Sequence, residues 1–225
     1  PWCTNGPGEA ELGGTMEATL SDWADQCHAQ GGTVIAPHIG GLTGEIVALI
    51  ATGRIEGMEM VRMHERAHTG YYQTLNCGYR IPLVAGTDKM SADVTVGLSR
   101  TYARLPEGQD FDYDNWCKAV ASGRTFASSG PIIRLSVDGH GIGDTLQIPG
   151  PGTVEVEATA ESIFPMYSLE IVQEGRVVAS VHSKEGSRRL ILSEKIAVDG
   201  HTWLAARCGG PEYYTEGNFN SGQPP

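Results

Sequence analysis

The spacing of hydrophobic residues changes character about halfway along the chain. Up to residue 127, segments with apolar residues on one helical face alternate with short apolar runs rich in branched side chains. From residue 131 to residue 208, apolar and polar residues instead alternate one by one, and glycine, proline or aspartate turns interrupt the alternation. The first period predicts amphipathic helices and the second predicts half-buried strands. The sequence therefore predicts an α/β region followed by an all-β region, with a boundary at residues 127–131.

Helices and strands are expected to alternate in the first region. Thr19 or Ser21 can cap the first helix and Thr43 the second, because their hydroxyls accept hydrogen bonds from free backbone N–H groups. The expected helices cover residues 19–30, 43–52, 70–77 and 113–121, and the expected strands cover residues 33–38, 55–63 and 81–88. Such alternation with short connections is typical of a parallel α/β sheet or barrel. In these folds the functional residues gather at the carboxyl ends of the strands.

The second region reads as an antiparallel β-sandwich of the Ig-like kind, because it is built from several short strands with no helical period between them. The expected strands cover residues 132–139, 153–162, 168–181, 188–198 and 201–208. The domains predicted in this way are an α/β domain over residues 1–127, a sandwich over 128–210 and a polar tail over 211–225. Residues of one alternation phase should form the sandwich core: Leu135, Val137, Val154, Val156, Leu169, Ile171, Val178, Leu190, Leu192 and Trp203.

Composition and charge exclude several classes of protein. The chain has 27 acidic and 16 basic residues, a net charge of −11, and no basic cluster of the kind that nucleic acids require, so no nucleic-acid partner is expected. No apolar run reaches the roughly 20 residues that cross a bilayer, so no membrane partner is expected either. The five cysteines are scattered and form no C-x-x-C pair, which argues against a disulfide framework or a thiolate zinc site. The chain starts at Pro1 without a methionine and is expected to be part of a longer protein; periplasmic, secreted and cytoplasmic locations stay open.

Candidate chemistry lies where the predicted strands of the first region end. His38 and Asp88 each follow a predicted strand, and Glu59 lies within or near the end of the strand between them. One imidazole and one or two carboxylates at the same edge of a sheet form a mixed N/O ligand set that suits zinc, manganese or iron. Gly86 would leave room for the ion. The alternative is that His38 and Asp88 are ordinary turn and capping residues.

Other charged residues have weaker claims to a functional role. Lys89 and Arg100 could neutralise an anionic substrate, although an Arg in this setting is more often a surface or structural ion pair. His64 and His68 have the i, i+4 spacing of a metal pair on a helix, but they follow a strand, so an exposed loop or the start of a helix is expected there.

Six ordered segments resemble one known family. They are "GGTVIAPHIGG", "GRIEGMEM", "YYQTLNCGYRIPLVAGTDKMSA", "VGLSRTYA", "GRTFASSGPIIRLSVDG" and "TWLAARC". In this order they resemble the C-terminal part of the CehA/McbA-like metallohydrolases, a branch of the PHP (polymerase and histidinol phosphatase) superfamily, over residues 21–208. The resemblance implies a partial, distorted β/α barrel that holds divalent metal ions and precedes the sandwich. It also implies hydrolysis of phosphoesters, or of esters, amides or carbamates.

The resemblance assigns roles to particular residues and also shows two departures. His38 and Asp88 match family metal ligands, whereas Glu59 matches a position outside the ligand set or facing the substrate. Met90 stands where the family has the histidine of its last ligand motif, and thioether sulfur is a poor ligand for hard divalent ions. The His-x-His motif of the family's first strand is missing. Either the chain is a fragment whose upstream part holds the remaining ligands, in which case it should be inactive alone, or it is a metal-poor relative that does not catalyse.

Three functions follow as hypotheses. The first is a metal-dependent hydrolase that acts on a small anionic or ester-like substrate by means of water activated by the metal. The second is a non-catalytic binding protein whose sandwich recognises a carbohydrate or a partner. The third is a glycosidase with paired carboxylates such as Glu45, Glu56 or Glu59. The oligomeric state is not predicted.

Overall fold

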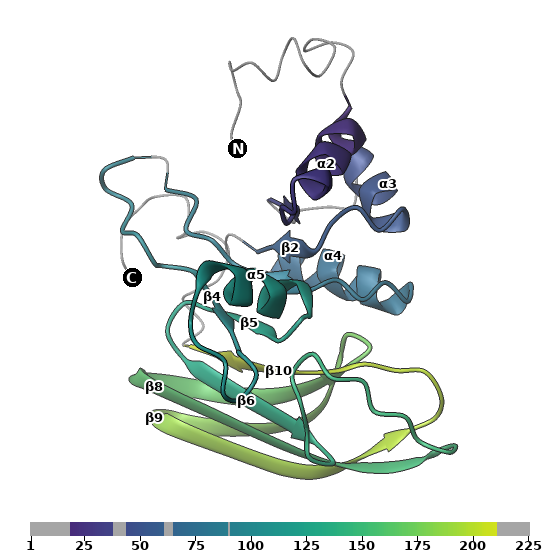
Figure 1. Ribbon diagram of the computed structural model, residues 1–225. Helices are drawn as coiled ribbons and strands as arrows, with labels where there is room; N and C mark the ends of the chain where they lie inside the picture. Colours follow the sequence, from purple (N-terminus) through teal and green to yellow (C-terminus); the bar gives the residue numbers. More distant parts are fainter. Residues whose placement is uncertain (1–18, 38–43, 61–64, 90, 211–225) are drawn as a thin grey trace.

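The computed structural model describes residues 19–37, 44–60, 65–89 and 91–210. These residues form a mixed α/β structure in which helices precede residue 122 and strands dominate after it (Figure 1). The helices are α2 (Leu20–Ala29), α3 (Glu45–Ala51), α4 (Glu65–Asn76) and α5 (Tyr113–Ala121). No helix in the described part of the chain is long and apolar enough to span a bilayer.

The first sheet is parallel, as the alternation of helices and strands predicts. It consists of β1 (Ile35–Ala36), β2 (Gly57–Glu59) and β3 (Leu83–Val84), in the order β1-β2-β3. Side chains from α2, α3 and the sheet form one buried cluster, which consists of Ala24, Ala36, Leu49, Ile50, Ile55, Met58 and Ile81. The described strands of this sheet do not close on themselves, so the barrel that the resemblance implies stays an expectation.

Local sequence explains where most helices begin. Thr19 caps α2 in a capping box: its side chain accepts a hydrogen bond from the Asp22 backbone N–H, and the Asp22 carboxylate accepts one from the Thr19 backbone. Helix α3 begins after Gly44, which makes no side-chain capping hydrogen bond. The expected cap, Thr43, lies outside the described residues. Helix α4 begins at Glu65, whereas the sequence placed its start at residue 70. The prediction was late because the first turn of the helix is polar and lacks the apolar period that reveals a helix. His68 therefore lies in the helix start that was expected, whereas His64 lies outside the described residues.

The pattern of apolar residues did not predict two strands of the first region. They are β4 (Arg100–Ala103) and β5 (Thr125–Ser128), which pair antiparallel. The rings of Tyr102 and Phe126 stack across this pair at 4.8 Å between centroids. The Thr125 hydroxyl donates to the Leu83 carbonyl at 2.7 Å, which ties β5 to β3. Their sequences, RTYA and TFAS, do not alternate strictly between apolar and polar residues.

The second region is all β, as predicted, with no helix between residues 131 and 208. Its strands are β6 (Ile132–Val137), β7 (His140–Gly141), β8 (Gly152–Gln173), β9 (Arg176–Val198) and β10 (Leu204–Gly209). The turn between β8 and β9 has positive φ at Glu174 and Gly175, the geometry of a tight hairpin. All five strands belong to one hydrogen-bonded sheet rather than to two, so a two-sheet sandwich is not established.

The long β8–β9 hairpin breaks register in its middle. The pairing is interrupted between Glu161 and Met166, and the two halves of β8 have different further neighbours: β6 pairs with the first half and β10 with the second. Both halves nevertheless contribute to one buried cluster, which consists of Val154, Val156, Ala158, Ala160, Met166, Leu169, Ile171, Leu190, Leu192, Ile196 and Val198. The sheet is therefore folded around a single core.

Two residues expected in this core lie elsewhere. Val178 is 42% exposed, because a register shift pairs Ile171 with Ala179 and Val172 with Val177 and leaves Val178 as the extra residue of a bulge. Trp203 lies against α4 instead. Its ring is 4.9 Å from that of Tyr72, and its Nε1 donates to the Asn76 side chain at 2.8 Å.

The core assignment predicts a large loss of stability for Leu169→Ala. Leu169 is fully buried, so removing three carbons leaves a cavity and should lower the free energy of unfolding by about 2–5 kcal/mol. Ile191 on β9 is 56% exposed, and Ile191→Ala should change the free energy of unfolding by less than about 0.5 kcal/mol. Urea denaturation followed by circular dichroism measures both, and equal effects would contradict the core.

Candidate functional site

The carboxyl ends of the three parallel strands lie along one edge of the first sheet. The register places Ala36 beside Met58, and Glu59 beside Val84. The segments that follow β1, β2 and β3 therefore leave the sheet at the same edge, which is where His38, Glu59 and Asp88 were expected to meet. His38 lies outside the described residues, so its pairing with Asp88 stays a prediction.

Glu59 projects along this edge and lies over Gly86. A Cβ added to Gly86 would overlap Glu59 Oε1 and would lie 3.2 Å from the Glu59 carboxyl carbon. The Glu59 side chain is half-buried. The missing side chain of Gly86 thus makes room for a carboxylate, and the room for an ion that the sequence suggested stays an expectation.

Asp88 is exposed and lies four residues beyond the end of β3. Its φ is +49°, in the left-handed region that Asp and Asn tolerate better than most residues do. Such a backbone occurs in turns and is also common at functional sites, where the surrounding structure holds it. Both interpretations of Asp88, turn residue and metal ligand, are compatible with this geometry.

Threonine hydroxyls close the base of the loop that carries Asp88. The Thr101 hydroxyl accepts a hydrogen bond from the Ala85 N–H and donates one to the Ala85 carbonyl, both at 2.8 Å. The Thr87 hydroxyl accepts one from the Gly97 N–H, also at 2.8 Å. The loop that joins β3 to β4 is therefore closed at its base, because its two ends are hydrogen-bonded to each other.

The two cations proposed to face substrate lie on this loop and on β4. Lys89 Nζ donates to the backbone carbonyl of Ser91 at 2.7 Å and also to that of Val94, so the ammonium group holds the loop together. The sequence did not indicate this structural role. Arg100 is exposed at the start of β4, with Nη1 3.5 Å from the Tyr102 hydroxyl. Contact of either cation with a substrate stays a prediction.

The carboxylates of the glycosidase hypothesis are not brought together. Glu56 precedes β2 and accepts a hydrogen bond from the Val34 N–H at 2.7 Å, whereas Glu59 ends the same strand. The two residues thus lie at opposite ends of β2, about 10 Å apart along the strand. Glu45 lies near the N-terminus of α2 and accepts from the Leu20 N–H at 3.4 Å.

The donor chemistry at the carboxyl edge suits a divalent ion only in part. Within the described ranges, no three His, Cys, Asp or Glu side chains are close enough to hold a metal. Glu59 and Asp88 offer oxygen donors at or near the edge, and the expected nitrogen donor, His38, is outside those ranges. A complete ligand set would therefore need side chains beyond the ones described.

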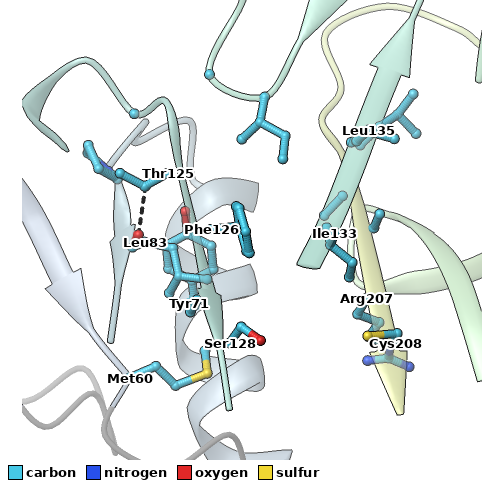
Figure 2. Close-up of a pocket in the computed structure, with 18 of the residues that line it drawn as sticks. Met60, Tyr71, Leu83, Thr125, Phe126, Ser128, Ile133, Leu135, Arg207 and Cys208 are labelled. Carbon is cyan, nitrogen blue, oxygen red and sulfur yellow. Dashed lines mark hydrogen bonds between the residues drawn. The ribbon is translucent and has the colours of Figure 1, made fainter. Parts of the chain in front are cut away.

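A large cleft separates the α/β region from the β region. Its volume is about 2450 Å³, and Figure 2 shows Tyr71 and Phe126 on one side and Ile133, Leu135 and Cys208 on the other. The cleft also reaches the carboxyl edge, where it is lined by Met60 and Asp88. We refer to it as the interlobe cleft. Sequence patterns missed it because its walls join segments that are far apart in the chain.

Two hydroxyls in the walls of the interlobe cleft are hydrogen-bonded to the protein backbone. The Tyr71 hydroxyl donates to the Ile81 carbonyl at 2.8 Å, and Ser128 Oγ accepts from the Gly130 N–H at 3.0 Å. Burial raises the pKa of Tyr71 and raises the pKa of the Cys208 thiol to about 11. Both side chains are therefore uncharged near neutral pH.

Comparison with known proteins yields little. No family model and no curated protein matches the chain. A solved structure that resembles it is a two-domain protein of Bacteroides vulgatus containing a predicted PHP-like metal-dependent phosphoesterase, with 12% sequence identity and a TM-score of 0.41. The match covers 81% of this chain and 57% of that protein, so this chain spans little more than half of its length. A TM-score of this size does not establish a common fold.

The raised pKa of Cys208 predicts slow alkylation at pH 8. Only about one thiol in a thousand is ionised three pH units below its pKa, and the thiolate is the reactive form. Cys77 is exposed, so iodoacetamide should modify it at least about tenfold faster than Cys208. Raising the pH from 8 to 10 should accelerate labelling of Cys208 about a hundredfold. Mass spectrometry of tryptic peptides gives both rates, and equal rates at pH 8 would contradict the buried thiol.

The threonine closure predicts that Thr101→Val destabilises the loop. Valine keeps the shape of threonine but leaves the Ala85 N–H and carbonyl without their partner, which should cost about 1–3 kcal/mol. Thr95→Val, at an exposed position of the same loop, is the matched control and should be nearly silent. Thermal unfolding together with hydrogen exchange of residues 85–101 tests this. Unchanged exchange in Thr101→Val would show that the closure is unimportant.

Proposed function

We propose that this chain is part of a PHP-type metal-dependent hydrolase of the CehA/McbA-like branch, acting on phosphoesters or on esters, amides or carbamates. The observation that carries the proposal is the parallel order β1-β2-β3, because it sends the segments bearing His38, Glu59 and Asp88 away from the same sheet edge. The six ordered sequence segments support it independently, because in this order they resemble segments of that branch.

Each candidate residue has a distinct role in this proposal. A divalent ion such as zinc, manganese or iron would supply the positive charge that activates a water molecule. His38 would bind it through an imidazole nitrogen and Asp88 through a carboxylate oxygen. Glu59 would face the substrate or orient a ligand. Arg100 would counter the charge of an anionic substrate, with Lys89 as a second cation on the neighbouring loop.

The ligand set is incomplete within these residues under this proposal. The sequence contains no His-x-His, and Met90 stands where a further histidine would bind. We therefore propose that other ligands come from a part of the protein outside these 225 residues. The chain alone would then bind a metal weakly and would not turn over substrate.

A second candidate is a non-catalytic binding protein, and the interlobe cleft favours it. A cavity of about 2450 Å³ could hold a ligand whether or not a metal is bound at the carboxyl edge. Metal content separates the two candidates, because only the hydrolase requires an ion at that edge.

The proposal predicts that Asp88→Asn weakens metal binding without changing the fold. Asparagine suits a left-handed turn as well as aspartate does, but it lacks the charge of a ligand. Loss of groups that merely support a ligand costs about 10–100-fold in affinity, so loss of a ligand charge should cost at least as much. Isothermal titration calorimetry with Mn²⁺ measures the affinity, and circular dichroism checks that the variant is folded.

Asp93→Asn is the matched control, because Asp93 lies in the same loop and the substitution removes the same charge. Its carboxylate is hydrogen-bonded to Ser91, which lowers its pKa and gives it a local role. The control should bind Mn²⁺ as the wild type does. In a longer chain that includes upstream sequence, Asp88→Asn should also lose hydrolysis of a chromogenic phosphodiester. Equal Mn²⁺ affinity and equal turnover in Asp88→Asn and wild type would leave Asp88 as a turn residue and overturn the proposal.

A further inference from the structure

We propose that the interlobe cleft is a binding site for a neutral, apolar small molecule. The proposal concerns the middle of the cleft, between the β4–β5 pair and strand β6. It does not require a metal, and none of its arguments depends on His38, Glu59 or Asp88.

Apolar side chains face the cleft from both lobes. Figure 2 shows Met60, Tyr71 and Phe126 on the α/β side, opposite Ile133 and Leu135 on β6. Near the cleft mouth, Leu98 and Phe164 come from opposite lobes and are 53% and 66% exposed. An apolar lining contributed by two lobes is typical of small-molecule sites.

Three hydroxyls in the walls are already used in hydrogen bonds within the protein. Tyr71 and Thr125 donate their hydroxyl protons to backbone carbonyls, at 2.8 and 2.7 Å. Ser128 donates to the Pro131 carbonyl and accepts from the Gly130 N–H. A polar ligand would have to break these bonds or stay unpaired in a buried place, and either is costly. An apolar ligand meets no such cost.

One ion pair lines this part of the cleft. Arg207 Nε donates to Glu170 Oε2 at 2.6 Å, and the Glu170 side chain is only 19% exposed. Cys208 beside it is kept as the neutral thiol, because burial raises its pKa. A charged ligand would compete with an existing ion pair, so the walls favour a neutral molecule.

Contacts between the lobes bound the cleft on two sides. Trp203 Nε1 donates to Asn76, and Arg80 donates to Thr145 Oγ1 at 2.7 Å and to the Gly143 carbonyl. The lobes are therefore joined at both places. Because about 2450 Å³ exceeds the roughly 300–1,000 Å³ of ordinary ligand pockets, a small ligand would fill only part of it.

The cleft also connects this site to the carboxyl edge through Met60 and Asp88. A ligand seated between Phe126 and Ile133 could extend toward that edge and become a substrate there. This last step rests on the proposed function, whereas apolar binding itself does not.

The test is titration of the chain with Nile red, a neutral dye whose emission shifts to shorter wavelength in apolar surroundings. We expect saturable binding of one dye per chain. Ile133→Asp places a charge in the apolar wall and should weaken binding at least tenfold. Ile191→Asp, on an exposed part of β9, is the control and should bind as the wild type does. Circular dichroism shows whether both variants are folded.

Two further measurements keep the proposal testable if Ile133→Asp does not fold. Phe164→Ser changes an exposed residue at the cleft mouth and should weaken dye binding several-fold. Bound dye should also slow alkylation of Cys208 in the cleft while leaving Cys77 unaffected. Non-saturable binding, equal affinity in Phe164→Ser and wild type, or no protection of Cys208 would each overturn the proposal.

The same titration in the presence of a metal chelator separates this proposal from the proposed function. Dye binding by wild type and by Asp88→Asn should be equal, with or without the chelator. Dye binding that is lost in the chelator or in Asp88→Asn would show that it depends on the metal edge and would overturn the independent apolar site. Loss of Mn²⁺ binding with unchanged dye binding would bear only on the proposed hydrolase function.

Discussion

The break in the β8–β9 hairpin between Glu161 and Met166 is the constraint on which the second half of the molecule depends. Strands of 22 and 23 residues are much longer than the usual 3–10, and in one flat hairpin they would leave a long apolar face uncovered. The break lets the two halves turn toward each other, so Val156 from one half and Leu169 from the other are buried in one core. It also brings β6 and β10, which pair with different halves of β8, into contact.

The placement of this folded sheet against the α/β region follows from chain connectivity and from α4. Strand β5 leads into β6 through only residues 129–131, so the two lobes are joined by a very short link. A second connection between the lobes is made by Tyr72 and Asn76 of α4. Both contact Trp203, which the alternation pattern had assigned to the core. Because Trp203 packs at the interface between the lobes, the lobes stay together while a large cleft remains between them.

The carboxyl edge of the first sheet has a different physical basis. There the parallel strands are only two or three residues long, and the segments beyond them are held by side chains rather than by the sheet. Thr87 and Thr101 fasten the Asp88 loop, Lys89 binds the loop's own carbonyls, and Glu59 occupies the space above Gly86. This arrangement holds Asp88 in a left-handed backbone at the mouth of the cleft, so the edge and the cleft form one continuous surface.

The sequence by itself determined the features that depend on neighbouring residues. The cap at Thr19 and the alternation along β8 and β9 could be predicted, because each depends on residues close together in the chain. Parallel order in the first sheet followed from the alternation of helices and strands. Tertiary structure alone decided the rest. The pairing of β4 with β5, the bulge that exposes Val178 and the move of Trp203 to the interface all depend on partners distant in sequence. The cleft does too, because its walls come from segments that meet only when both lobes are folded, and no local pattern records which segments will meet.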